Sequence, residues 1–126
     1  MSTCISLIES NVKFKKADAD VILLILKDFA KNNKLRWGDE YEILSSNNIE
    51  ECFKKLRYPL TEKEDYYIID EFDGEKLGDE ERIFNSIYKY IEKGSYFEYA
   101  GEDGDRFRLV FGDRKCEYKY PKLIWD

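Results

Sequence analysis

The chain has 126 residues, of which 43% are hydrophobic and 16% aromatic, and it carries a net charge of −6 with no histidine. This length fits one domain, and the aromatic content argues against disorder although 38% of the residues are charged. No apolar run approaches the ~20 residues of a membrane-spanning helix, and the N-terminus lacks the features of a signal peptide. We therefore expect a single domain, residues 1–126, of a cytoplasmic protein without membrane contact.

Residue usage argues against catalysis and metal binding. The three cysteines, Cys4, Cys52 and Cys116, are far apart and match no zinc-binding or redox spacing. Each lies in an apolar pattern, so we expect three reduced, buried thiols that react slowly with a thiol reagent. The absence of histidine removes the commonest general base and most zinc sites. No enzyme activity, cofactor or metal site is therefore expected.

The first third of the chain predicts strand structure followed by a helix. Short alternations of apolar residues in 3–14, interrupted by two polar residues, indicate one or two strands. A helix is expected over 18–31, where apolar residues recur at intervals of three and four. Its main apolar face holds Ile22, Ile25, Leu26 and Phe29. Val21 and Leu24 widen that face, so we expect the helix to be covered on more than one side.

Residues 34–58 predict a turn, a short strand and a short helix. The turn contains Trp37, which is either a core residue or an exposed anchor; large aromatic residues more often bury most of their area. The short strand is expected over 41–44. A helix should begin at Asn47, with Glu50 three residues later in the spacing of a capping box. Its apolar face holds Ile49, Cys52, Phe53 and Leu56.

Negative charge is concentrated in residues 62–81. This window holds ten acidic and two basic residues, a net charge of −8, so the remainder of the chain nets +2. Such a run is either a solvated surface, which is its commoner role, or a site that attracts a basic partner. An apolar strand, 66–69, lies inside the window, and the loop after it leads into a helix. The acids we assign to partner binding are Asp70, Glu71, Asp73, Glu75, Asp79 and Glu80.

The last third of the chain predicts a helix followed by a meander of strands. The helix is expected over 79–93, with acids in its first turn and Gly94 as the residue that ends it. Three antiparallel strands should follow over 94–120, and the apolar residues of 121–126 suggest a docked terminal strand. Together these elements predict an α+β domain, with about three helices packed on one side of a mainly antiparallel sheet.

The first turn of the meander determines which face is buried. Asp103 and Gly104 are the residues that a two-residue type I′ turn favours, and such a turn places Glu98 opposite Leu109 on the core face. A buried acid is costly unless it is paired. Either an edge position or a bulge turns Glu98 to solvent, which is the commoner case, or Glu98 is a site acid tuned by its environment. The core face would also carry Tyr96, Ala100, Phe107, Phe111, Cys116, Tyr118 and Tyr120. The opposite face would carry Phe97, Tyr99, Arg106, Arg108, Glu117 and Lys119.

One stretch resembles a known group of proteins. The string GSYFEYAGEDG at 94–104, followed by Phe107-Arg108 and Phe111, is similar to the C-terminal part of small uncharacterised bacterial α+β proteins. Those proteins read GSYxE, GEDG, an aromatic–Arg pair and a Phe, and some resemble the immunity partners of secreted bacterial toxins. The resemblance implies a turn, a core and a strand, and it transfers no functional residue.

Three hypotheses of function follow. The first is a non-catalytic protein-binding domain, an immunity-type inhibitor whose acidic surface covers a basic toxin domain such as a nuclease. The second is a structural or regulatory domain that self-associates through the aromatic, Arg-bearing face of the meander. The third is an enzyme of unrecognised type that uses Glu98 with Arg106 or Arg108. Nucleic-acid binding is not expected, because these arginines and Lys119 form only a small basic strip.

Overall fold

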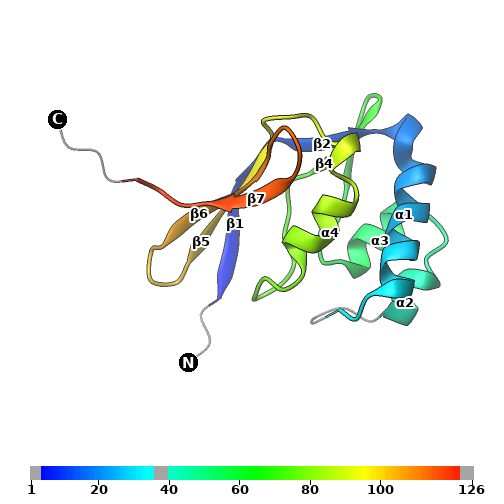
Figure 1. The fold of residues 1–126 in the computed structure, drawn as a ribbon, viewed down its shortest axis with the longest axis horizontal. Helices are drawn as coiled ribbons and strands as arrows, with labels where there is room; N and C mark the ends of the chain where they lie inside the picture. The colour runs from blue at the N-terminus through cyan, green and yellow to red at the C-terminus, as the bar shows by residue number, and fades with distance from the viewer. Residues whose placement is uncertain (1–3, 36–39, 123–126) are drawn as a thin grey trace.

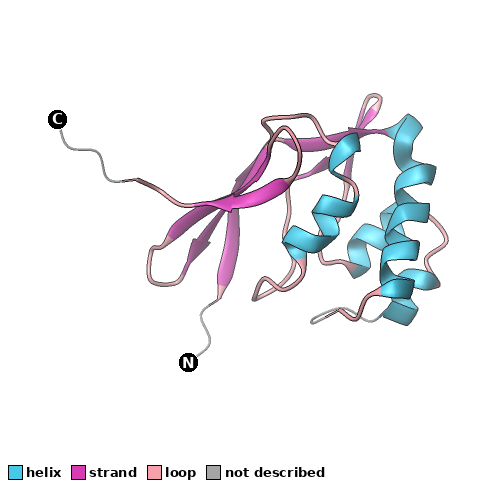
Figure 2. Ribbon diagram, viewed as in Figure 1, coloured by secondary structure: helices cyan, strands magenta, loops and turns pink. Residues whose placement is uncertain are grey.

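The fold combines two antiparallel sheets with a group of helices. The computed structural model describes residues 4–35 and 40–122 (Figure 1). Within these residues one sheet has the strand order β1-β5-β6-β7 and the other has the order β2-β4-β3. The helices lie together on one side of the sheets (Figure 2). The predicted α+β class is confirmed, and the strands are divided between two sheets.

The elements have the following bounds. The strands are β1 (Ile5–Ser10), β2 (Val12–Lys15), β3 (Thr61–Lys63), β4 (Tyr66–Ile69), β5 (Tyr96–Gly101), β6 (Arg106–Phe111) and β7 (Cys116–Lys119). The helices are α1 (Ala19–Asn32), α2 (Glu40–Leu44), α3 (Ile49–Lys55) and α4 (Glu80–Ser86), with single 3₁₀ turns at η1 (Lys16–Asp18) and η2 (Tyr88–Tyr90).

The junction between β1 and β2 joins the two sheets. Only Asn11 separates these strands, at the polar break that the sequence contains. Asn11 Oδ1 accepts a hydrogen bond from the backbone N–H of Tyr96 (2.8 Å), and Ser10 Oγ donates to the carbonyl of Ile69 (2.6 Å). The junction is therefore tied to β5 in one sheet and to β4 in the other.

Helix α1 lies where it was predicted, but one side of it is uncovered. Ile22, Leu26 and Ala30 are buried where α1 packs against α2, α3 and α4. The exposed fractions of Leu24 and Val21 are 67% and 36%, so the expectation of cover on a second side is wrong for the described residues. Helix α1 lies at the outside of the helical layer, so part of its surface has no other helix beside it (Figure 1).

The segment after α1 also differs from the prediction. The short strand expected over 41–44 is instead helix α2, whose single buried residue is Ile43. Helix α3 begins at Ile49, and its N-cap is Asn48 instead of the expected Asn47, with Asn48 Oδ1 accepting from the N–H of Glu51 (2.8 Å). Its predicted apolar face is buried as expected. The prediction for Trp37 lies outside the described residues.

Helix α4 is shorter than predicted. It ends at Ser86, and a 3₁₀ turn, η2, takes the place of the expected last turns. The polar side chains at its end bond to nearby carbonyls, as Ser86 Oγ does to Ile83 O (2.5 Å) and Asn85 Nδ2 to Glu81 O (2.8 Å). The helix still packs on the meander, because the Phe84 ring lies 5.0 Å from that of Phe97.

The meander is confirmed, but its first turn is not the predicted one. Gly101 and Asp105 close the turn between β5 and β6, because Gly101 N donates to Asp105 O (2.9 Å), and the loop between them has three residues, 102–104. Gly104 N donates to Gly101 O (3.1 Å) within this turn. Gly104 has a φ of +90°, as in a type I turn followed by a left-handed residue. The additional loop residue shifts the register by one and exchanges the two faces of β5.

This register buries the face of β5 that was expected to be exposed. Phe97 and Tyr99 are fully buried, whereas Glu98 lies on the outer face opposite Arg108. Tyr96 and Ala100, expected in the core, share that outer face. On β6 and β7 the core holds Phe107, Leu109, Phe111, Cys116 and Tyr118 as predicted. Tyr120, which was also expected on the core face, is exposed and lies beyond the end of β7.

The cysteines differ in exposure, which corrects the expectation of three buried thiols. Cys52 and Cys116 are buried, and burial raises the pKa of each thiol to about 12. Cys4 is exposed, because it lies just before β1 with no element covering it in the described part of the chain. A hydrogen bond with Glu102 is the main cause that raises the pKa of Cys4.

We therefore predict that a maleimide labels one thiol of the native protein, Cys4, and that Cys52 and Cys116 react only after unfolding. Labelling of Cys4 should accelerate as the pH rises toward its pKa, because the thiolate is the reactive form. Mass spectrometry of the labelled peptides at successive times measures this. Modification of Cys52 or Cys116 at the rate of Cys4 would contradict the core assignment.

The remaining expectations concern the termini and the membrane. No helix in the described part of the chain is long and apolar enough to cross a membrane. Of the terminal strand expected over 121–126, residues 123–126 lie outside the described residues, and Pro121 and Lys122 are exposed and not in a strand.

Candidate partner-binding surface

The candidate surface is centred on residues 70–78, here called the acidic loop, which connects β4 to α4. The side chains assigned to partner binding in the first part of this loop are all exposed. They are Asp70, Glu71, Asp73 and Glu75. The loop has no helix or strand of its own, so its shape depends on bonds to the surrounding elements.

Arg57 fixes the acidic loop to the core. Its Nη1 donates to the carbonyl of Lys76 (2.8 Å), its Nη2 lies 3.5 Å from Glu80 Oε2, and its guanidinium lies over the Phe72 ring, 5.2 Å from the centroid. Its own carbonyl accepts from the N–H of Asp73 (2.8 Å). Arg57 therefore contacts the loop at Phe72, Asp73 and Lys76, and the helix that follows the loop at Glu80.

The backbone at Arg57 is unusual. Its φ is +75°, in the left-handed region that favours glycine, directly after the C-cap of α3. A non-glycine residue in this conformation costs about 1 kcal/mol or more. The loop also approaches it closely, because a Cβ added to Gly74 would lie 2.7 Å from Arg57 Nη1. The strained backbone and the glycine allow the guanidinium to reach all of its partners.

Phe72 anchors the loop from the inside. Its ring packs on that of Tyr58, with centroids 5.0 Å apart, and meets the edge of Tyr99 at 6.2 Å. The acids on either side of Phe72 alternate with it and point to solvent. An apolar residue facing inward between exposed acids thus gives the loop a fixed inner and outer side.

Glu80 is buried beneath the loop, which corrects its assignment to the binding surface. It is 2% exposed. Its Oε2 accepts from the Tyr58 hydroxyl (2.9 Å) and its Oε1 from the N–H of Gly78 (2.6 Å). Because Tyr58 donates to Glu80, the neighbouring Tyr99 hydroxyl, 2.8 Å away, donates to Tyr58. Burial raises the pKa of both tyrosines well above the ordinary value, so they remain donors.

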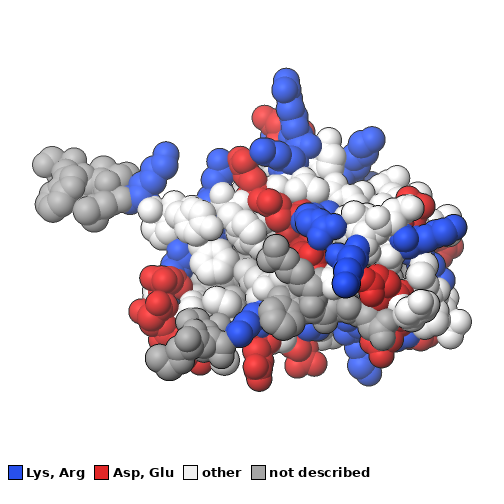
Figure 3. Space-filling view, turned by 60° about the horizontal axis from the view of Figure 1, so that its bottom comes forward, with Lys and Arg blue, Asp and Glu red and all other residues white. Residues whose placement is uncertain are grey.

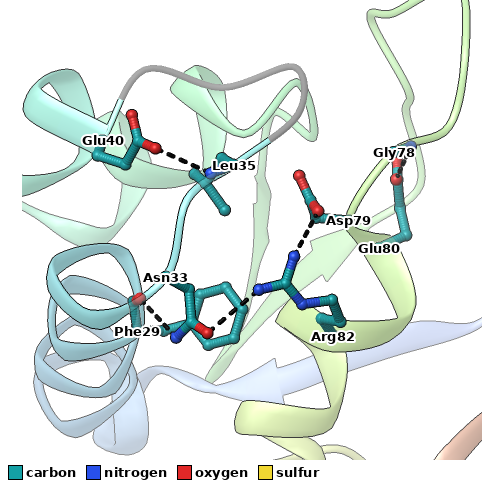
Figure 4. A network of polar contacts seen from close by, with 8 residues as sticks. All are labelled: Phe29, Asn33, Leu35, Glu40, Gly78, Asp79, Glu80 and Arg82. Atoms are coloured by element: carbon teal, nitrogen blue, oxygen red, sulfur yellow. Dashed lines mark hydrogen bonds and ion pairs between the residues drawn. The ribbon is translucent and has the colours of Figure 1, made fainter.

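Asp79 is also buried, which corrects its assignment to the binding surface. It is 6% exposed and accepts a hydrogen bond from Arg82 Nη1 (2.9 Å). Arg82 Nη2 donates in turn to Asn33 Oδ1 (3.1 Å) at the end of α1, and Asn33 Nδ2 donates to the carbonyl of Phe29 (2.9 Å) (Figure 4). This chain of contacts ties the start of α4 to α1, so Asp79 and Glu80 have structural roles.

The charged window of the sequence is not one surface. Glu62 lies in β3, and Glu64 and Asp65 form the turn between β3 and β4, at the opposite end of β4 from the acidic loop. Glu62 is paired there with Lys16, at 2.9 Å between Nζ and Oε2. These acids therefore do not add to the charge of the loop.

Acids from a distant part of the sequence do add to it. Ile5 donates its N–H to the carbonyl of Glu75 (2.7 Å) and lies opposite Gly101 in β5. The first residues of β1 thus lie between the acidic loop and the β5–β6 turn (Figure 1). That turn exposes Glu102, Asp103 and Asp105. We call these three residues and the four exposed acids of the loop the acidic surface.

The sequence alone did not reveal this extension. The signal was present in the acidic hairpin turn, but the pairing of β1 with β5 was needed to place it. Figure 3, which brings the lower side of Figure 1 forward, shows Asp and Glu side chains at the left and along the lower rim, with Lys and Arg side chains between them.

On the outer face of the meander, Glu98 is paired with two arginines. Glu98 Oε1 accepts from Arg108 Nε (2.7 Å) and its Oε2 from Arg106 Nη1 (3.1 Å). The hydrogen bond from Arg108 is the main cause that lowers the pKa of Glu98, opposite to the change a general acid needs. Phe97 and Tyr99, expected to form an adhesive aromatic face here, are in the core.

We predict that Glu98→Gln lowers the melting temperature at pH 7 and has little effect at pH 3. A carboxyl whose folded pKa lies below its unfolded value stabilises the fold above the unfolded pKa, and loses this contribution as the pH falls through the folded pKa. The difference between Glu98→Gln and the original protein should therefore shrink as the pH falls below about 4.3, the ordinary pKa of Glu, and vanish once the pH lies below the folded pKa.

Thermal melts at both pH values measure this effect, with the exposed Glu92→Gln as a matched control that should change neither melt. A loss of stability by Glu98→Gln that is equal at pH 3 and pH 7 would show that the charge of Glu98 is not its source.

Two further findings complete the description of the site. No cluster of three or more His, Cys, Asp or Glu side chains able to hold a metal ion occurs in residues 4–35 and 40–122. Comparisons with protein-family models, curated proteins and solved structures give no match to this chain.

Proposed function

We propose that this protein is a non-catalytic binding domain whose acidic surface engages a basic protein partner. The observation that carries the proposal is the fixation of the acidic loop by Arg57, which leaves four carboxylates exposed on a loop with a defined shape. Clustered charge of one sign raises the local concentration of an oppositely charged partner and speeds its association. A loop already held in place loses little conformational entropy when it binds.

Within this class, an immunity-type inhibitor of a bacterial toxin is the role we favour. The support is the resemblance of residues 94–111 to proteins of that kind, the small size of the chain and its lack of a recognisable catalytic motif. Such an inhibitor acts in the cytoplasm of the cell that makes the toxin. A basic toxin domain, such as a nuclease, would present the positive surface that the seven exposed acids attract.

The proposal is tested by capturing binding proteins from a lysate of the source organism. The immobilised proteins are the original and two variants that have the same net charge as each other. One variant neutralises the acidic loop by Asp70→Asn, Glu71→Gln, Asp73→Asn and Glu75→Gln. The other neutralises four exposed acids elsewhere by Asp20→Asn, Glu42→Gln, Glu81→Gln and Glu92→Gln.

The original protein and the second variant should capture the same basic protein, and the loop variant should lose most of it. Equal capture by both variants would show that only the net charge matters, and the proposed surface would be rejected. Melting temperatures of the two variants should stay close to that of the original, because substitutions at exposed positions rarely destabilise.

A further inference from the structure

The second surface of interest is the outer edge of β7, the last strand of the four-stranded sheet. The N–H of Gly112 donates to the carbonyl of Lys115 (2.9 Å), so the odd-numbered residues of β7 direct their backbone groups toward β6. Because backbone groups alternate along a strand, those of Cys116, Tyr118 and Tyr120 point away from the sheet.

Of these outward-pointing backbone groups, those of Cys116 are already hydrogen-bonded to a side chain. Asn85 of α4 accepts from the N–H of Cys116 with its Oδ1 (2.8 Å) and donates to the carbonyl of Cys116 with its Nδ2 (2.9 Å). This side-chain amide forms the two bonds that a neighbouring strand would form. No described residue does the same for Tyr118 and Tyr120, so their outward N–H and C=O groups are available for pairing.

A row of charges on the outer face leads to this edge. Glu9, Glu98, Arg108 and Lys119 lie opposite one another across the four strands. Arg108 is paired with Glu98, whereas Lys119 faces Arg108 across β6 and β7, an unfavourable arrangement of like charges. Lys119 forms an ion pair with Glu117 of its own strand, with 2.9 Å between Nζ and Oε1. An acid on a further strand would lie directly opposite Lys119.

The neighbourhood of the edge is basic. A hollow of about 610 Å³ on the outer face adjoins it, and four of its lining residues are cationic. These are Arg106, Arg108, Lys119 and Lys122, against one acid, Glu98. Side chains of an added strand that point to this face would enter a positively charged environment.

We propose that the open edge of β7 binds an extended acidic segment of a partner protein as a fifth strand, with a carboxylate opposite Lys119. Strand addition of this kind uses backbone hydrogen bonds for affinity and alternate side chains for specificity. A second copy of this chain is a poorer occupant. Two β7 edges joined through Tyr118 and Tyr120 would place Lys119 opposite Lys119 of the second copy. This surface is separate from the acidic surface and opposite to it in charge.

End-blocked seven-residue peptides in which three Glu residues alternate with Val provide the probe, and matched peptides carry Gln or Lys in place of Glu. The Glu peptide should bind at least about fivefold more tightly than the Gln peptide, as expected for added charge pairs at a partly exposed site. Fluorescence anisotropy of labelled peptides measures the affinities. Lys119→Glu should invert the preference toward the Lys peptide, whereas the exposed control Lys89→Glu should leave it unchanged.

Backbone pairing has its own readout. The amides of Tyr118 and Tyr120 should exchange rapidly with solvent in the free protein and become protected when the Glu peptide is bound. Tyr120→Pro removes one of the two unpaired N–H groups, the one that lies beyond the end of β7. It should therefore weaken binding without lowering the melting temperature.

Several results would overturn the proposal. They are absence of saturable binding of the Glu peptide up to about 1 mM, equal affinity for the Glu and Gln peptides, or binding that leaves the Tyr118 and Tyr120 amides unprotected. Protection of these amides that rises with protein concentration alone would make a second copy the occupant and would refute the acidic segment.

Discussion

Replacing Glu80 by Ala should lower the free energy of unfolding by about 3–5 kcal/mol, the range observed when one member of a buried charged pair is removed. The carboxylate accepts from the Tyr58 hydroxyl and from the N–H of Gly78, and it is paired with Arg57. None of these donors has a replacement in the shortened side chain. The N–H of Gly78 would lose its side-chain acceptor and Arg57 its charged partner, in a region where Glu80 itself is 2% exposed.

The neighbouring residue provides the control. Glu81 is exposed in the same helical turn, so Glu81→Ala should change the free energy of unfolding by no more than about 0.5 kcal/mol. Urea denaturation followed by circular dichroism measures both variants. Equal stability of Glu80→Ala and Glu81→Ala would mean that the carboxylate of Glu80 does not hold the loop to the core.

The second large effect is expected at Arg57. Arg57→Ala removes the hydrogen bond to Lys76 O, the pair with Glu80 and the stack on Phe72. We expect a loss of about 2 kcal/mol, typical of hydrogen bonds that involve a charged group. The acidic loop should open more often than the rest of the fold. The amides of Asp73 and Ile5, which bond across the ends of the loop, should therefore exchange faster with solvent.

A second substitution at the same position separates the side chain from the backbone. Glycine adopts a φ of +75° without strain, so Arg57→Gly should be more stable than Arg57→Ala by up to about 1 kcal/mol. Lys54→Ala, at an exposed position of α3, should be close to the original protein. If Arg57→Ala leaves exchange at Asp73 and Ile5 unchanged, the loop does not depend on Arg57 for its shape.

Elements with a strongly repeated apolar pattern were predicted correctly from the sequence. The strand register was not, because it depends on a difference of one residue in the length of a turn. The apolar faces of α1 and α3 and the three strands of the meander were recognised because each repeats its period several times. An Asp-Gly pair, however, fits both a two-residue and a three-residue turn. The difference moved Phe97 and Tyr99 into the core and Glu98 out of it, although β6 and β7 were assigned correctly.

The same limit applies to the candidate site. A run of acids predicts exposed charge, and for residues 70–75 that prediction agrees with the structure. The run does not tell which acids meet buried donors, because Tyr58 and Arg57 reach Glu80 from a separate part of the chain. For the same reason, the acids of the β5–β6 turn could join the surface only once β1 had been placed beside β5.

The association rate with the captured basic partner, measured by stopped flow at about 50 mM and about 500 mM salt, tests the central claim most directly. At low salt the loop variant, with Asp70, Glu71, Asp73 and Glu75 neutralised, should associate at least about tenfold more slowly than the original protein. The rate of the original should fall steeply with salt, because ions screen exposed charges. The variant with four acids neutralised elsewhere should behave like the original. An association rate that is the same in both salts, or a loop variant that binds as fast as the original, would contradict the account.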